Sequence, residues 1–178
     1  MEFEYMRDYA MYAFIFGLLS FIWFTWAQER PRKSWRRYIW IGSGLALVVS
    51  LIGIYLSVTN WDAATRINDV GVLSMYFTVL ITLIIIGVIV SIILSRNKKQ
   101  DLIAPWITFL LGVQFNWFVR VFNDFGLYLL GFLIVVVALL APHFAKKYGV
   151  ASSAITGVGA GAVLFLFAVY GLVRFLLV

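Results

Sequence analysis

The stretch ITLIIIGVIVSIIL, residues 81–94, carries no charge and runs directly into the basic segment 95–99, SRNKK. An α-helix rises about 1.5 Å per residue, so about 20 apolar residues cross the ~30 Å hydrocarbon core of a bilayer. Extended over Val70–Ser95, the stretch is long enough for one crossing and is bounded by charges where a crossing should end. It therefore predicts a membrane-spanning helix.

Five other segments have the same apolar character and length. Of the 178 residues, 63% are hydrophobic and 12% are charged, too few charges to cover a surface facing water. The segments are apolar on all faces, whereas a membrane strand would alternate apolar and polar residues. We therefore predict an all-α integral membrane protein, with residues 1–178 forming a single transmembrane domain and six helices in one bundle. The expected helices are 9–27, 38–58, 70–95, 104–122, 125–141 and 152–177.

Two prolines mark expected helix ends. Pro105 fits the first turn of the fourth helix, where its missing N–H costs no hydrogen bond. Pro142 follows the fifth apolar segment, and proline commonly stops a helix. The fifth helix is accordingly predicted to end near residue 141. The main alternative makes this short segment re-entrant and removes one span.

The basic residues predict the orientation. Lys and Arg gather in the loops near residues 28–37, 96–103 and 142–151, which contain ten of the 14 basic residues. The other side has four basic residues and six acids. Because cytoplasmic loops are enriched in Lys and Arg, we expect these three loops in the cytoplasm and both termini on the non-cytoplasmic side, most simply of the plasma membrane.

Most tryptophans lie near predicted helix ends. Trp23, Trp26, Trp35, Trp40 and Trp61 are expected to anchor the protein at the membrane interface, because an amphipathic ring favours the headgroup layer. Trp117 lies deeper and fits that role less well.

Polar residues cluster in the fourth span. Asn116, Arg120 and Asp124 follow each other at four-residue spacing, and Asn123 lies seven residues after Asn116, so all four share one helix face. Gln114 lies about 160° away from Asn116 at 100° per residue. Polar groups at this depth are costly in lipid and should face the bundle interior. They predict an outward-facing ligand site, with interhelical hydrogen bonding and pairing of Arg120 with Asp124 as the structural alternative.

The third span offers facing groups for this site, namely Tyr76, Thr78 and Thr82. The sixth span carries small residues at helical spacing: Gly157, Gly161, Ala168 and Gly171. Small residues let helix backbones approach closely in a membrane, where apolar burial cannot drive association, so these four are predicted to pack against another helix.

The sequence indicates little chemistry. It contains no cysteine and one histidine, so we expect neither a metal site nor a cofactor. The net charge of +6 lies beside apolar spans, which favours lipid headgroups over nucleic acid as partners. We expect a non-enzymatic protein that binds or transports a small solute. The alternatives are an accessory, regulatory or immunity-type subunit with a membrane-protein partner and, more remotely, a membrane enzyme acting on lipid.

In length and number of spans the chain resembles the substrate-binding subunits of energy-coupling-factor vitamin transporters. The small-residue pattern of their first helix is matched here by Ala13 and Gly17 alone. Their termini face the cytoplasm, opposite to the orientation predicted here, so the resemblance is one of architecture and does not assign the chain to that family.

Overall fold

The computed structural model describes residues 6–63, 70–122 and 124–177. Within these ranges, the side chains of residues 70–73, 75–76 and 120–122 lie outside the description. Of the predicted site, Asn123 and the side chains of Tyr76 and Arg120 therefore lie outside the described residues.

The described residues form helices joined by short loops and contain no strand. Six of its helices are long and apolar enough to cross a membrane, so the protein is a polytopic membrane protein. The helices are α1 (Met6–Trp26), α2 (Arg36–Thr59), α3 (Val70–Arg96), α4 (Ile103–Phe122), α5 (Gly126–Tyr148) and α6 (Ser152–Leu177), and a 3-10 helix, Gln100–Leu102, precedes α4.

The prediction that α5 ends at Pro142 is wrong. Pro142 lies inside α5, which continues to Tyr148. A proline removes one backbone hydrogen bond but can be accommodated when the turns on both sides are held. The helix ends instead at Gly149, which adopts the left-handed conformation with φ of 65° and donates its N–H to the Ala145 carbonyl.

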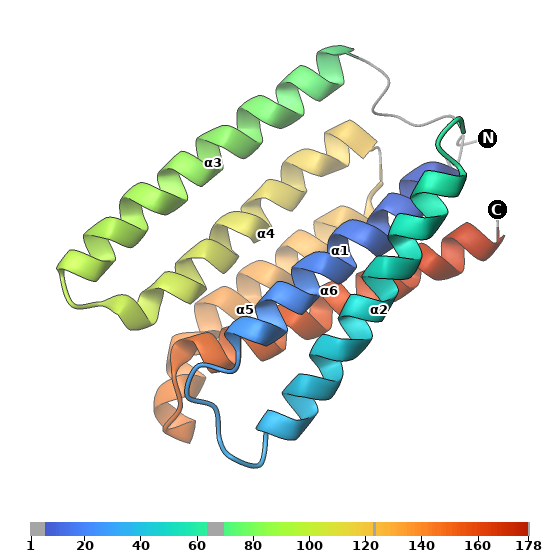
Figure 1. Cartoon of the computed structure of the whole chain (residues 1–178). Coiled ribbons are helices and arrows are strands. Elements are labelled where there is room, and N and C mark those ends of the chain that lie inside the picture. The colour runs from blue at the N-terminus through green and yellow to red at the C-terminus, as the bar shows by residue number, and fades with distance from the viewer. Residues whose placement is uncertain (1–5, 64–69, 123, 178) are drawn as a thin grey trace.

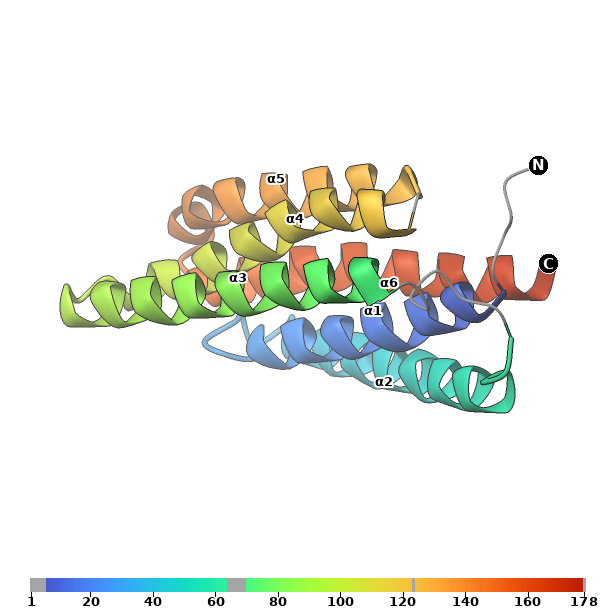
Figure 2. The same ribbon diagram turned by 90° about the horizontal axis from the view of Figure 1, so that it is seen from above.

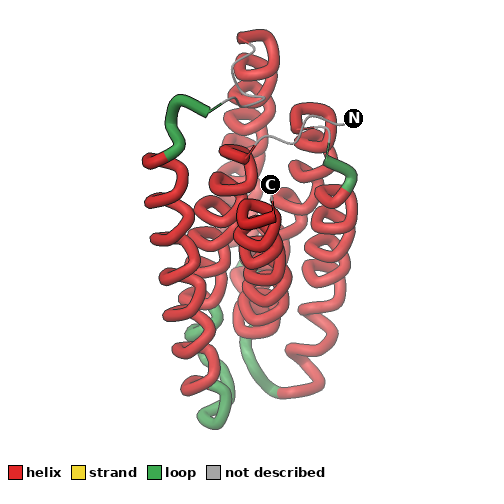
Figure 3. The backbone as a smooth tube through the Cα atoms, turned by 90° about the vertical axis from the view of Figure 1, so that its right-hand side faces the viewer, coloured by secondary structure: helices red, strands yellow, loops and turns green. Residues whose placement is uncertain are grey.

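The helices run alternately up and down (Figures 1 and 3). The start of α1 and the end of α6 lie at one end of the bundle, which we call the terminal end (Figure 1). The links α1–α2, α3–α4 and α5–α6 lie at the opposite end, which we call the basic end because it carries the three Lys- and Arg-rich loops.

Helix α1 packs along both α2 and α6, and α4 packs against α5. Figure 2 shows α4 and α5 on one side of the bundle and α1 and α2 on the other. Helix α3 contacts the rest of the protein mainly through α4 and the 3-10 helix. The fold therefore consists of five closely packed helices and one outlying helix.

Small residues lie where α1 meets its two neighbours. A Cβ atom built on Gly157 of α6 would lie 2.7 Å from the Ala27 Cβ, and one on Gly171 would lie 2.9 Å from the Tyr12 Cβ. A Cβ on Gly161 would meet the Phe24 ring at 3.0 Å, and Ala168 is fully buried. The four small residues singled out in the sixth span thus lie in the interior, three of them directly against α1.

Candidate functional site

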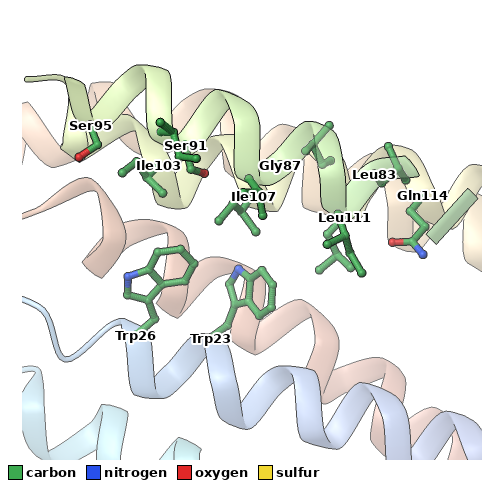
Figure 4. A pocket seen from close by; sticks show the side chains of 14 residues that line it. Trp23, Trp26, Leu83, Gly87, Ser91, Ser95, Ile103, Ile107, Leu111 and Gln114 are labelled. Atoms are coloured by element: carbon green, nitrogen blue, oxygen red, sulfur yellow. The ribbon is translucent and has the colours of Figure 1, made fainter. Parts of the chain in front are cut away.

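A groove of about 630 Å³ lies between α1, α3 and α4 (Figure 4). We call it the α3 groove. Its walls are almost entirely apolar, and two aromatic rings from α1 form one side. The lining residues are Trp23, Trp26, Leu83, Ile84, Gly87, Val88, Ser91, Ile92, Ser95, Ile103, Ile107, Leu110, Leu111 and Gln114.

The aromatic side of the groove is held in place from within the bundle. The indole N–H of Trp23 donates to Thr108 Oγ1 of α4 at 2.7 Å. The Trp23 and Trp26 rings meet edge to face with centroids 6.3 Å apart. Trp23 is only 6% exposed, so the expectation that it anchors the protein at the membrane interface is wrong. Its N–H is satisfied by α4, and its ring faces the groove.

Few polar side chains line the groove. Gln114 is 7% exposed and points into the groove (Figure 4). The Ser91 hydroxyl is buried and unpaired among the described residues. An unpaired polar group away from water carries a free-energy cost that a ligand with a matching group would relieve.

The polar residues of α4 divide between two faces. Gln114 faces α1 and α3, whereas Asn116 is exposed and lies toward α5. The Asn116 Nδ2 bonds the Gly112 carbonyl of its own helix at 3.4 Å, and its Oδ1 lies 3.3 Å from the position of a Cβ on Gly131. The two amides therefore do not converge on one ligand.

Asp124 begins α5. Its Oδ1 accepts the Gly126 N–H at 2.7 Å, which satisfies a free donor in the first turn of that helix. The Asp124 carboxylate also lies near the Tyr12 hydroxyl of α1. Asp124 thus lies where the start of α5 approaches α1.

Threonines of α3 bond their own helix. The Thr78 hydroxyl donates to the Ser74 carbonyl at 2.9 Å, and the Thr82 hydroxyl donates to the Thr78 carbonyl at 2.8 Å. Both threonines are exposed and neither lines the groove.

Sequence reasoning missed the polar contacts of α1. Arg174 of α6 donates to the Tyr9 hydroxyl at 3.1 Å, and its guanidinium lies 5.2 Å from the centre of the Tyr9 ring. Arg7 bonds the Trp61 carbonyl at 2.6 Å and lies over the Trp61 ring at 4.0 Å. A charge inside an apolar segment is the available signal, since Arg174 lies within the sixth span.

The chain matches no protein-family model, no curated protein and no solved structure. Among the described residues, no group of three His, Cys, Asp or Glu side chains could hold a metal ion. The α3 groove is therefore the feature from which a function can be inferred.

Proposed function

We propose that the protein binds a small, mainly apolar solute in the α3 groove, with Gln114 as its polar contact. The single observation behind this proposal is the Gln114 side chain facing an apolar groove of about 630 Å³. Ligand sites typically combine apolar walls with a few polar groups that fix orientation. The proposed site stays on the fourth helix, with Gln114 rather than Asn116 as its polar contact.

The solute would carry one hydrogen-bonding group. The Gln114 amide offers a carbonyl acceptor and two N–H donors, so it can bind a hydroxyl, a carbonyl or an amide. It lies 11 residues from the start of α4, about 16 Å along the helix and so near the middle of a bilayer.

A pair of matched probes tests this proposal. Decanol has an apolar chain and one hydroxyl, whereas decane has the chain alone. We expect decanol to raise the midpoint of thermal unfolding in detergent by several degrees more than decane does, because only decanol bonds Gln114. Gln114→Leu should remove the difference between the probes, and the matched control Asn116→Leu should keep it.

Two outcomes would reject the proposal. One is an equal shift with decanol and decane in the wild-type protein. The other is a decanol-specific shift lost in Asn116→Leu but kept in Gln114→Leu, which would place the site on the polar face toward α5.

The second candidate function is an accessory subunit of a membrane complex. The observation that favours it is the exposure of α3, whose large aliphatic side chains are uncovered over most of the helix. An apolar helix of a partner could pack there. Because the chain has no cysteine, a single cysteine at Ile89 can be crosslinked in the native membrane. A defined crosslinked product at Ile89, absent for a cysteine at the equally exposed Leu129 of α5, would favour this function.

We further propose that the basic end faces the cytoplasm and that the protein belongs to the plasma membrane. The concentration of Lys and Arg in the three loops at that end supports this orientation. Single cysteines at Ser34 and Asp62 should react with a membrane-impermeant thiol reagent from opposite sides, with Asp62 labelled in intact cells. Labelling of Ser34 alone in intact cells would reverse the orientation.

A further inference from the structure

A second groove, of about 540 Å³, lies between α2 and α6 near the basic end. We call it the α2–α6 groove. It is lined almost entirely by apolar atoms, from Trp35, Tyr38, Ile39, Gly42, Phe24, Ile155, Val158 and Gly159. From Trp35 to Gly42 it follows α2 for seven residues, about 10 Å. It therefore runs from the end of the bundle into the depth of the hydrocarbon core.

A cation lies beside the mouth of this groove. The Arg32 guanidinium lies 5.6 Å from the centre of the Trp35 ring and 5.1 Å from that of the Tyr148 ring. Its Nε and Nη2 donate to the Tyr148 carbonyl at 3.3 and 3.2 Å. A guanidinium has five N–H groups, so donors remain for a further acceptor. The Arg32 side chain is exposed and can be reached by a ligand.

The first turn of α2 adds positive charge at the same place. No side chain caps this helix, because Trp35 at the N-cap makes no side-chain hydrogen bond. The exposed Arg36 follows. Free N–H groups and the helix dipole favour an anion at a helix start.

Aromatic side chains surround the mouth at this level. Trp35 and Tyr148 meet edge to face with centroids 6.0 Å apart, and Tyr38 is largely exposed. Trp and Tyr rings favour the headgroup layer of a bilayer, where one edge is wet and the other apolar. The mouth therefore lies where a lipid headgroup would lie.

We propose that the α2–α6 groove binds one phospholipid with an anionic headgroup. One acyl chain lies in the groove, and the phosphate accepts hydrogen bonds from Arg32 at the start of α2. Charge complementarity selects this ligand: an apolar slot that ends among exposed cations matches an acyl chain that ends in a phosphate and an anionic headgroup. Arg binds phosphate with particular strength because its planar fork can donate two parallel hydrogen bonds.

This site is distinct from general attraction of the basic loops to the membrane. Diffuse attraction depends on the number of cations and treats Arg32 and Arg37 alike. A specific binding site distinguishes the two arginines. Arg32 lies against the groove-lining Trp35, whereas Arg37 is two residues beyond Trp35 and about 160° around the helix from it.

The test uses the full chain in detergent with lipids of the same acyl chains. Binding of phosphatidylglycerol, phosphatidylcholine and headgroup-only glycerol phosphate is measured by native mass spectrometry. We expect one phosphatidylglycerol to bind, at least tenfold more tightly than phosphatidylcholine, and glycerol phosphate not to bind.

Two pairs of variants locate the lipid. Arg32→Gln should weaken phosphatidylglycerol binding about tenfold, as expected for one lost charge-assisted hydrogen bond, while Arg37→Gln should leave it within about twofold. Ile155→Phe fills the groove and should abolish binding of that lipid. Ile54→Phe, which places the same ring on an exposed part of α2, should not.

The proposal is overturned if Arg32→Gln and Arg37→Gln weaken binding equally, because attraction would then be diffuse. It is also overturned if phosphatidylcholine binds as tightly as phosphatidylglycerol, or if Ile155→Phe and Ile54→Phe behave alike. If Arg32→Gln fails to fold, the pair at Ile155 and Ile54 decides the question.

Discussion

Helices α1, α2 and α6 meet through small residues, whereas α3 meets its neighbour through large aliphatic ones. A Cβ on Gly53 of α2 would lie 2.7 Å from the Phe14 Cα, so the α1 and α2 backbones nearly touch. A Cβ on Gly87 of α3 would meet only the Leu110 Cδ1, at 3.4 Å. The α1–α2 contact leaves no space between the two helices, and we call α1, α2 and α6 the closed region. The α3–α4 contact leaves a groove.

The difference follows from the membrane as a solvent. Lipid tails are as apolar as leucine, so Ile and Leu gain little by leaving lipid for a neighbouring helix. Close backbone approach and interhelical hydrogen bonds favour helix association instead. The α1 contacts have both, since Ser20 donates to the Gly161 carbonyl at 2.8 Å and Ser50 donates to the Phe14 carbonyl at 3.1 Å. Helix α3 has neither along the groove.

The largest expected effect comes from emptying the closed region. Leu164 of α6 is fully buried, whereas Leu166 of the same helix is 66% exposed. Leu164→Ala should lower the free energy of unfolding by about 2–4 kcal/mol, because it leaves a cavity among packed side chains. Leu166→Ala should change it by less than about 0.5 kcal/mol. Reversible unfolding in mixed micelles measures both free energies. Equal losses in the two variants would contradict the difference between the closely packed helices and the exposed surface.

Adding a methyl group to the closed region tests the same contrast from the other side. Gly53→Ala should lower the free energy of unfolding by about 1–3 kcal/mol, since the new Cβ meets the α1 backbone. Gly44→Ala in the same helix meets nothing within 4 Å and should be neutral or slightly stabilising. A neutral Gly53→Ala would show that α1 and α2 are not in backbone contact.

The hydrogen bond that holds the aromatic side of the α3 groove should have a smaller effect. Trp23→Phe removes the N–H that bonds Thr108. Hydrogen bonds between membrane helices contribute about 0.6 kcal/mol on average and up to about 1.7 kcal/mol, so a loss of about 1 kcal/mol is expected in the same assay. Trp40→Phe is the control, because Trp40 is 63% exposed and should matter less. If both variants lower the free energy of unfolding equally, the hydrogen bond to Thr108 adds no stability of its own.

The smallest effect is expected on α3. Ile89 is 51% exposed, so Ile89→Ala should change the free energy of unfolding by less than about 0.5 kcal/mol. A loss of 2 kcal/mol or more in native membranes, but not for the purified chain, would show that another protein covers α3 there. That result would favour the accessory-subunit function.

The number and approximate limits of the helices could be predicted from the sequence, because apolar length alone decides them. Pro142 was a misleading sign of a helix end, since a helix can continue past a proline when the following turn keeps its own contacts. The face of α4 was predicted from helical periodicity, which separated Gln114 from Asn116. Periodicity alone could not show that Gln114, and not Asn116, faces an open groove, because that depends on where α1 and α3 lie.

The role of Trp23 could not be read from the sequence for the same reason. A tryptophan near a predicted helix end is typical of an interface anchor, and only its partner Thr108, 85 residues away, places it inside. The proximity of Asp124 to Tyr12 likewise brings together residues that no local pattern relates.

The most direct test of the α3 groove as a binding site is to fill it without disturbing the closed region. Gly87→Phe places a ring in the groove, and Gly44→Phe places the same ring in open space on α2. The measurement is the rise in unfolding temperature that decanol causes in each variant. The rise should vanish in Gly87→Phe and persist in Gly44→Phe. An unchanged rise in a folded Gly87→Phe protein would contradict binding in the α3 groove.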